Sequence, residues 1–139
     1  MRIILDTNIL IAALMTRGTP PDRLYESWRD GRFALLTSEL QIEELRRVTR
    51  REGVRFRINP AQAGRLVNDL RHMATMLARL PTVAVSPDPY DNFLLAMAEA
   101  GRADLLVTGD KRGLLELSSH AGTRIVTARA AVDLLERST

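Results

Sequence analysis

The chain has 139 residues, roughly one domain at about 150 residues per domain. Its apolar fraction of 45% and charged fraction of 27% exclude a disordered chain, and the absence of cysteine excludes a disulfide scaffold, a thiolate metal site and a cysteine nucleophile. The net charge of +3, from 20 basic and 17 acidic residues, is only a weak indication of a nucleic-acid partner. No apolar stretch approaches the ~20 residues of a membrane span, and Asp6 interrupts the apolar start that a signal peptide would need. We therefore expect a cytoplasmic protein.

Short apolar runs alternate with helical patterns along the chain. We expect a strand at Arg2–Leu5, a helix over 8–15, and a second helix that follows Pro20 and ends at Gly31. A strand at 33–36 leads to a helix that begins at Ser38, where Ser38 and Gln41 have the spacing of a capping box. The remaining expected elements are a helix from Asn59 with the apolar seam Leu66, Leu70, Met73, Leu77 and Leu80, a strand at 82–85, a helix over 88–101, strands at 104–107 and Thr123–Val126, and a helix after Thr127. Segments 16–21 and 51–59 are expected to be loops.

Strands that alternate with helices indicate βαβ units and hence a mostly parallel sheet with helices on both faces. The sequence therefore predicts an α/β protein, a single-domain α/β/α sandwich over residues 1–139 with about five strands. In such a sheet, the ligand site lies outside the carboxyl ends of the strands.

Two acidic residues follow predicted strands. Asp6 comes directly after the first strand, and Asp110 follows the strand at 104–107. Each alone has a purely structural explanation, because Asp6 can cap the next helix and Gly109-Asp110 is ordinary turn chemistry. Together they are expected to share one edge of the sheet.

The helix after Ser38 carries two neighbouring glutamates. At about 100° per residue, Ile42, Leu45 and Val48 form its buried stripe. Glu43 then falls in the opposite arc, beside arginines with which it can form ion pairs at the surface. Glu44 falls at the margin of the apolar stripe and is directed toward the protein, so Glu44 is the candidate site residue.

A fourth acid, Asp91, stands in the first turn of a helix that is apolar almost all round and is therefore expected to be buried. The helix dipole favours an anion at this place, and Asp88 can cap the same helix before Pro89. Any one of these acids could be structural. Four of them at strand ends and helix starts favour a common site.

Arginines are concentrated just after Glu44. They are Arg46, Arg47, Arg50, Arg51, Arg55 and Arg57. Arginine binds phosphate in a bidentate fork, so Arg46, Arg50 and Arg55 are candidates for contacting RNA. A solvated charged face, neutralised by Glu39 and Glu43, explains the cluster equally well.

These motifs resemble, over essentially the whole chain, the PIN-domain ribonucleases, particularly the bacterial toxins of toxin–antitoxin pairs. The matching segments are Leu5-Asp6-Thr7-Asn8-Ile9-Leu10, Glu44-Leu45-Arg46-Arg47-Val48, Asp88-Pro89-Tyr90-Asp91-Asn92-Phe93-Leu94 and Leu106-Val107-Thr108-Gly109-Asp110-Lys111. The resemblance implies that Asp6, Glu44, Asp91 and Asp110 are catalytic acids that bind metal. It further implies that Asn8 supports the first of them, that Thr108 supports the last, and that Asp88 is an accessory. Tyr90 stands where many relatives carry another acid, which leaves one or two metals open.

The chemistry of these residues agrees with that resemblance. Two carboxylates about 4 Å apart repel by roughly 4 kcal/mol at an effective dielectric constant of 20, so a cluster of four needs a cation. Oxygen ligands without histidine or cysteine select Mg²⁺ or Mn²⁺. We therefore expect an RNA-cleaving hydrolase with RNA as substrate. By resemblance its partners would be a small antitoxin protein and a second copy of the chain, and the apolar seam to Leu80 together with Leu24 and Trp28 also favours a homodimer.

Several alternatives remain. A receiver domain needs a phosphoacceptor aspartate at the end of a central strand, which neither 33–36 nor 82–85 supplies directly. A phosphatase with an Asp-x-Asp nucleophile would need an acid where Asn8 stands. The third is a catalytically weak PIN fold that only binds RNA or protein, and a fourth is an RNA-processing nuclease without an antitoxin.

Overall fold

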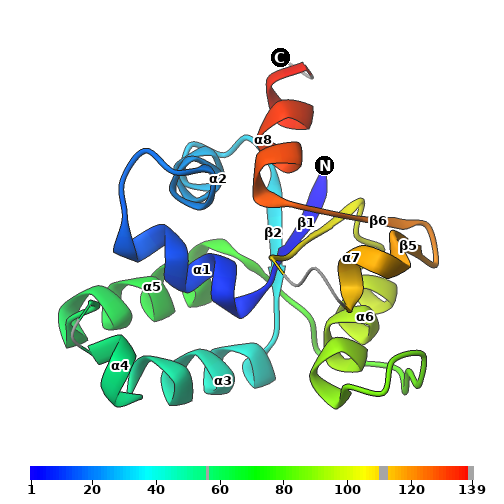
Figure 1. Cartoon of the computed structure of the whole chain (residues 1–139), viewed down its shortest axis with the longest axis horizontal. Helices are drawn as coiled ribbons and strands as arrows, with labels where there is room; N and C mark the ends of the chain where they lie inside the picture. Colours follow the sequence, from blue (N-terminus) through cyan, green and yellow to red (C-terminus); the bar gives the residue numbers. More distant parts are fainter. Residues whose placement is uncertain (56, 110–112, 138–139) are drawn as a thin grey trace.

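The computed structural model describes residues 1–55, 57–109 and 113–137, without the side chains of Glu52 and Arg55. A central sheet lies between two sets of helices (Figure 1). In chain order the elements are β1 (Arg2–Leu5), α1 (Thr7–Met15), α2 (Pro20–Arg29), β2 (Ala34–Thr37), α3 (Glu39–Thr49), α4 (Glu52–Arg55), α5 (Pro60–Met73), β3 (Thr75–Met76), α6 (Pro89–Gly101), β4 (Leu105–Val107), α7 (Leu114–Leu117), β5 (Ser119–His120), β6 (Thr123–Val126) and α8 (Ala128–Arg137).

Over the described residues, the sheet has six strands in the order β3-β2-β1-β4-β6-β5, and all pairs are parallel except β5 with β6. The mostly parallel sheet expected from the sequence is confirmed. In the register of the central pair, Leu5 lies opposite Val107, and Val107 lies opposite Val126. The carboxyl ends of β1, β4 and β6 therefore meet at one edge, directly before Asp6, Thr108 and Thr127.

Alternate residues of each strand face opposite sides of the sheet, as the two-residue period of a β-strand requires. Ile3 and Leu5 pack into a core with α1, α2, α3, α5 and α8, whereas Ile4 packs on the other side with α6 and α7. The central strands β1, β2 and β4 are buried on both faces, which explains why their sequences are continuous apolar runs. The molecule is thus an α/β/α sandwich. Within the part of the chain that the structure describes, no helix is long and apolar enough to cross a membrane.

The strand expected at 82–85 is wrong. That segment has no regular secondary structure, and the edge of the sheet is formed by Thr75–Met76, which pairs with the end of β2 through Leu36 and Thr37. The backbone becomes extended at Ala74, and the Leu77 N–H then donates to the Thr37 carbonyl over 2.8 Å. A two-residue strand with both residues exposed leaves almost no apolar signal in the sequence.

The apolar seam expected for one long helix belongs to two separate elements. Helix α5 ends at Met73, so Leu77 and Leu80 lie beyond it and pack against the core on the α6 side of the sheet. The side chains that the sequence argument for a dimer invoked are divided: Leu24, Trp28, Leu66 and Leu70 are buried within the chain, Leu77 and Leu80 are partly buried, and Met73 is exposed. A further difference is that the expected loop 51–59 contains the short helix α4.

The helix starts place polar groups at the carboxyl edge of the sheet. Asp6 caps α1, Ser38 caps α3 and Asp88 caps α6, each by accepting a backbone N–H of the first turn. Only half of the expected capping box at Ser38 forms. The Gln41 amide instead donates to the Leu5 carbonyl (2.7 Å) and accepts from the Thr37 hydroxyl (2.7 Å), so that it ties β1 to β2 beneath Asp6.

Candidate active site

Asp6 is buried at the end of β1, and three elements donate hydrogen bonds to its carboxylate. Its Oδ1 accepts the Asn8 N–H (3.2 Å) and the Tyr90 hydroxyl (2.9 Å), and its Oδ2 accepts the Thr108 hydroxyl (2.8 Å). Its own N–H donates to the Val107 carbonyl of β4 (2.9 Å). The side chain is therefore held in one orientation by groups from α1, α6 and the segment after β4.

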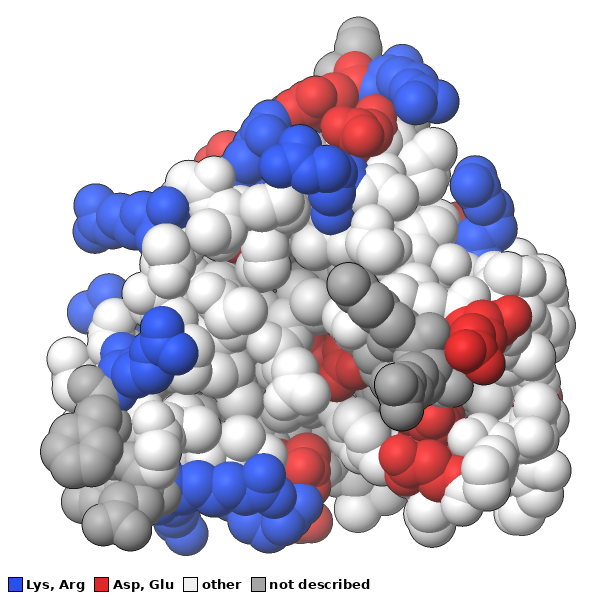
Figure 2. All heavy atoms as spheres, in the orientation of Figure 1, with Lys and Arg blue, Asp and Glu red and all other residues white. Residues whose placement is uncertain are grey.

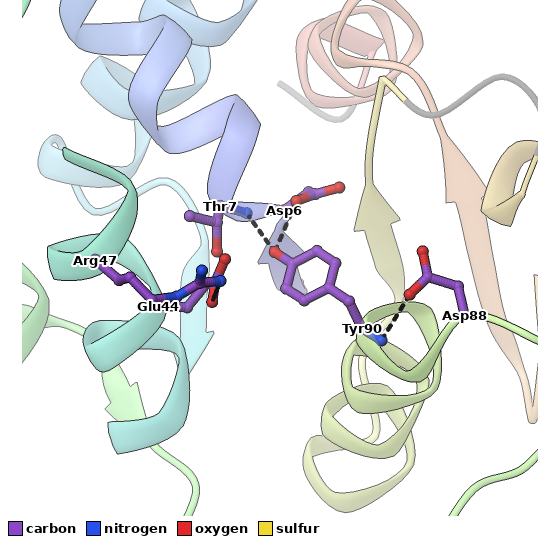
Figure 3. A network of polar contacts seen from close by, with 6 residues as sticks. All are labelled: Asp6, Thr7, Glu44, Arg47, Asp88 and Tyr90. Carbon is purple, nitrogen blue, oxygen red and sulfur yellow. Dashed lines mark hydrogen bonds and ion pairs between the residues drawn. The ribbon is translucent and has the colours of Figure 1, made fainter. Parts of the chain in front are cut away.

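Tyr90, in the first turn of α6, is the link between that helix and Asp6. Its hydroxyl donates to Asp6 and accepts the Thr7 N–H over 3.3 Å (Figure 3). Burial, and next the charge of Asp6, raise the pKa of the Tyr90 phenol well above its ordinary value. Tyr90 therefore stays a neutral hydrogen-bond donor at the position where, by the resemblance, many relatives carry another acid.

Asp91 is buried one residue further along α6 and accepts the Ser86 hydroxyl over 3.3 Å. The loop that carries Ser86 is held by Asn92. The Asn92 Oδ1 accepts the N–H groups of Val85 (3.0 Å) and Ser86 (2.8 Å), and its Nδ2 donates to the Ser86 carbonyl (2.7 Å). Asn92 thus fixes the loop that supports Asp91, a role that the sequence analysis did not assign.

Three carboxylates line one hollow of about 520 Å³ at the carboxyl edge of the sheet. The lining residues are Asp6, Asn8, Ile9, Asp88, Tyr90, Asp91 and Gly109. We call this hollow the acidic pocket. A neighbouring hollow of about 510 Å³ shares Asp88 and Asp91 with it and adds Glu116, an acid that the sequence analysis did not single out. Acidic side chains are visible in the middle of the face in Figure 2, where α1, α3 and α6 approach the sheet edge.

Glu44 does not line the acidic pocket. It is half-buried on α3 and pairs with Arg47, whose Nη2 lies 2.5 Å from Glu44 Oε2. In Figure 3, Glu44 lies on one side of Asp6, and Tyr90 with Asp88 on the other. The expectation that Glu43 forms the ion pair of this helix was wrong, because Glu43 is exposed and has no ion pair among the described residues.

Thr7, the first residue of α1, directly follows Asp6, and the sequence analysis did not single it out. Its hydroxyl is buried and has no hydrogen-bond partner among the described residues. In Figure 3 it points from the start of α1 toward the side of α3 that carries Glu44. An unpaired buried hydroxyl costs stability, and such groups concentrate at functional sites.

Thr108 and Asp110 complete the comparison with the sequence. Thr108, expected to support the last acid, donates to the first one, Asp6. Thr108 directly follows β4, the strand that pairs with β1. Because Val107 lies opposite Leu5, Thr108 lies level with Asp6. Asp110 lies outside the described residues.

The arginines expected to bind RNA separate into two places. Arg47 pairs with Glu44, whereas Arg46 and Arg50 line a groove of about 570 Å³ between α3 and α5, together with Arg71 and an apolar floor that includes Ile58 and Val67. We call this the arginine groove. Neither Arg46 nor Arg50 has an ion pair within the described part of the chain. Arg71 is held by both oxygens of Glu39. The side chain of Arg55 is outside the described structure.

A family model described as PIN domain matches residues 2–112, about four-fifths of the chain. The chain belongs to the PIN domain family. PIN domains are generally metal-dependent nucleases, so the receiver-domain and phosphatase alternatives fall away.

Two solved structures share the fold of this PIN domain. One is the crystal structure of PAE2754 from Pyrobaculum aerophilum, with a TM-score of 0.64 and 22% identity over 99% of this chain and 90% of that one. The other is VapBC2 from Rickettsia felis bound to a DNA fragment from their promoter, with a TM-score of 0.57 and 15% identity over 91% of this chain and 98% of that one. No curated protein gives a significant match.

The acidic pocket of this PIN domain has the donor chemistry of a site for Mg²⁺ or Mn²⁺. Among the described residues, no three Asp, Glu or His side chains lie close enough together to hold a metal ion. The carboxylates of Asp6, Asp88 and Asp91 nevertheless line one hollow, and carboxylate oxygens are the ligands that hard divalent cations prefer. The donor set therefore fits such an ion.

Replacing Asn92 with alanine tests the support of Asp91. Asn92→Ala removes three hydrogen bonds to the loop at 85–86, so we expect it to destabilise the protein by about 1–3 kcal/mol in urea denaturation. We also expect faster amide hydrogen exchange at Val85 and Ser86. Asn68→Ala, at an exposed position of α5, is the control and should change stability by no more than about 0.5 kcal/mol. Unchanged exchange at Val85 and Ser86 would contradict the role of Asn92.

Proposed function

We propose that this PIN domain is a metal-dependent ribonuclease and the toxin component of a toxin–antitoxin pair. The observation that carries the proposal is the acidic pocket, in which Asp6, Asp88 and Asp91 face one hollow at the carboxyl edge of a parallel sheet. This is where open α/β sheets bind their ligands. Family membership supports nuclease chemistry, and the acids are those that the motif resemblance selects.

Asp6 and Asp91 would hold the metal ion, with Glu44 and Asp110 added by resemblance. When bound, Mg²⁺ or Mn²⁺ supplies an activated water and neutralises charge on the scissile phosphate. The chain itself orients the ligands. Hydroxyls of Thr108 and Tyr90 fix the Asp6 carboxylate, and Ser86 does the same for Asp91. Preorganised ligands need no rearrangement when the ion binds, which favours catalysis.

Glu44 needs one change to join these acids. Its carboxylate is paired with Arg47, which is well exposed and can leave at little cost, because surface ion pairs are worth only about 0–1 kcal/mol. The buried Thr7 hydroxyl, which has no partner among the described residues, points to the same side of α3 (Figure 3). We therefore propose that Glu44 turns from Arg47 toward the acidic pocket when a cation is present.

The arginines of α3 explain how RNA would approach an acidic pocket. At about 100° per residue, Arg47, Arg50 and Arg46 lie about 60°, 120° and 160° around the helix from Glu44. They form a strip of positive charge that runs from the Glu44 side to the arginine groove. Basic side chains gather over α3 along the lower edge of Figure 2. A phosphate backbone that follows this strip would reach the pocket.

The partner proposals rest on one solved structure and on the family resemblance. The Rickettsia felis structure contains a VapBC pair, which supports an antitoxin partner for this chain. The homodimer is supported by the family resemblance, whereas most of the apolar residues first invoked for it are buried or partly buried within the chain and only Met73 is exposed.

Replacing Asp6 with asparagine tests the nuclease proposal. We expect Asp6→Asn to abolish Mn²⁺-dependent RNA cleavage, because the principal ligand loses its charge. The metal-free protein should melt at the same or a higher temperature, since like-charge repulsion in the pocket falls. The amide oxygen can keep the hydrogen bonds from Asn8 and Tyr90, and the Thr108 hydroxyl can turn to accept from the new amide NH2. Mn²⁺ at 100 times its dissociation constant should stabilise the wild type by about 2.7 kcal/mol and leave the variant unchanged.

The control for that experiment is Asp133→Asn, which removes a carboxylate from an exposed position of α8. It should cleave RNA and respond to Mn²⁺ as the wild type does. If Asp6→Asn cleaves RNA at the wild-type rate, Asp6 is not a catalytic metal ligand and the proposal fails.

Removing the arginines of the groove tests the proposed RNA path. Each phosphate contact contributes about −0.7 to the slope of log affinity against log salt for a single strand, so three contacts give about −2. Arg46→Ala with Arg50→Ala should flatten the slope by about 1.4 and weaken binding similarly for all sequences. The pair Arg129→Ala and Arg137→Ala on α8 removes the same charge from an exposed site elsewhere and should leave the slope unchanged. A wild-type slope in the first variant would show that Arg46 and Arg50 form only a solvated face.

A further inference from the structure

The Tyr90 side chain is fixed in the wall of the acidic pocket. Its backbone N–H donates to Asp88 Oδ1 (2.9 Å), and its ring packs against Phe93 with ring centroids 6.1 Å apart. Its hydroxyl is engaged on both sides, by the Thr7 N–H and by Asp6. The hydroxyl therefore has no freedom to move away from Asp6 without breaking these contacts.

The hydrogen bonds to Asp6 leave its two oxygens unequal. A carboxylate oxygen has two acceptor sites. At Oδ1 both are taken, by the Asn8 N–H and by the Tyr90 hydroxyl. At Oδ2 the Thr108 hydroxyl takes one, and no other group of the described residues takes the second. Asp6 thus presents one open acceptor site, on Oδ2.

This asymmetry limits how Asp6 can bind cations. Sites with two metal ions hold them about 3.5–4 Å apart. A carboxylate shared between the ions needs an open acceptor site for each of them, on one oxygen or on two. Oδ1 of Asp6 can be offered only if the Tyr90 hydroxyl leaves, because its proton points at that oxygen. A neutral phenol is also not among the ligands that hard divalent cations prefer, so the Tyr90 hydroxyl is no substitute for the Asp6 oxygen that it blocks.

We infer that Tyr90 closes the α6 side of Asp6 to metal ions, so that this chain binds one divalent cation where an acid at position 90 would allow two. The inference rests on the proposed function, since it concerns the same acidic pocket. Tyr90 is then a positioning residue that sets the metal stoichiometry.

Counting bound Mn²⁺ tests this inference on the metal-free full-length protein, with Mn²⁺ alone as the probe. Isothermal titration calorimetry and the electron paramagnetic resonance signal of free Mn²⁺ both give the number of ions per chain. We expect one ion in the wild type. Tyr90→Asp removes the hydroxyl from Oδ1 and adds a carboxylate at a helix start, where an acid is favourable, so this variant should bind two.

The matched control is Asn8→Asp, which adds a carboxylate to the same pocket but leaves Tyr90 on Oδ1. It should still bind one ion. Two ions in Asn8→Asp, or one in a folded Tyr90→Asp, would overturn the role of Tyr90.

The wild-type count needs no variant to fold. Two ions in the wild type would overturn the inference and leave the proposed nuclease function intact. No bound Mn²⁺ in the wild type would overturn both.

Discussion

The Asp6 carboxylate joins three parts of the chain that strand pairing and the two apolar cores bring to one edge of the sheet. It follows the central strand β1, caps α1 through the Asn8 N–H, and accepts hydroxyls from Tyr90 on α6 and from Thr108 after β4. A buried carboxylate is tolerated only when its oxygens are hydrogen-bonded. The surrounding elements are arranged so that they supply these hydrogen bonds to Asp6. That arrangement brings Asp88 and Asp91 into the same pocket and determines which oxygen of Asp6 stays open.

The fold and the acids on it were accessible from the sequence because each left a periodic signal. The buried strands Arg2–Leu5 and Thr123–Val126 are apolar runs, and parallel strands place their carboxyl ends together, which located Asp6. The stripe Ile42, Leu45 and Val48 is buried as expected, so the same helical arithmetic separated the half-buried Glu44 from the exposed Glu43. The start of α6 at Pro89 made the position of Asp91 predictable as well.

The features that were missed depend on contacts between distant residues. The edge strand β3 has two exposed residues and therefore leaves no apolar pattern in the sequence. Helix α5 ends just before β3, where the chain begins to pair with β2, and this end leaves no apolar pattern either. The hydrogen bond from Thr108 to Asp6, 102 residues away, was not predicted, because only strand register brings the two residues together. Tyr90 and Asn92 lie inside a recognised motif, but only the structure shows what they contact. The Tyr90 hydroxyl donates to Asp6 Oδ1, and the Asn92 amide holds the loop that supports Asp91.

The most direct test of this account is the anomalous scattering of Mn²⁺ in crystals of the protein. The account predicts a peak in the acidic pocket, with Oδ2 of Asp6 and a carboxylate oxygen of Asp91 as its ligands and the Tyr90 hydroxyl still on Oδ1. A pocket without a peak at saturating Mn²⁺, or an ion bound away from Asp6, would contradict it.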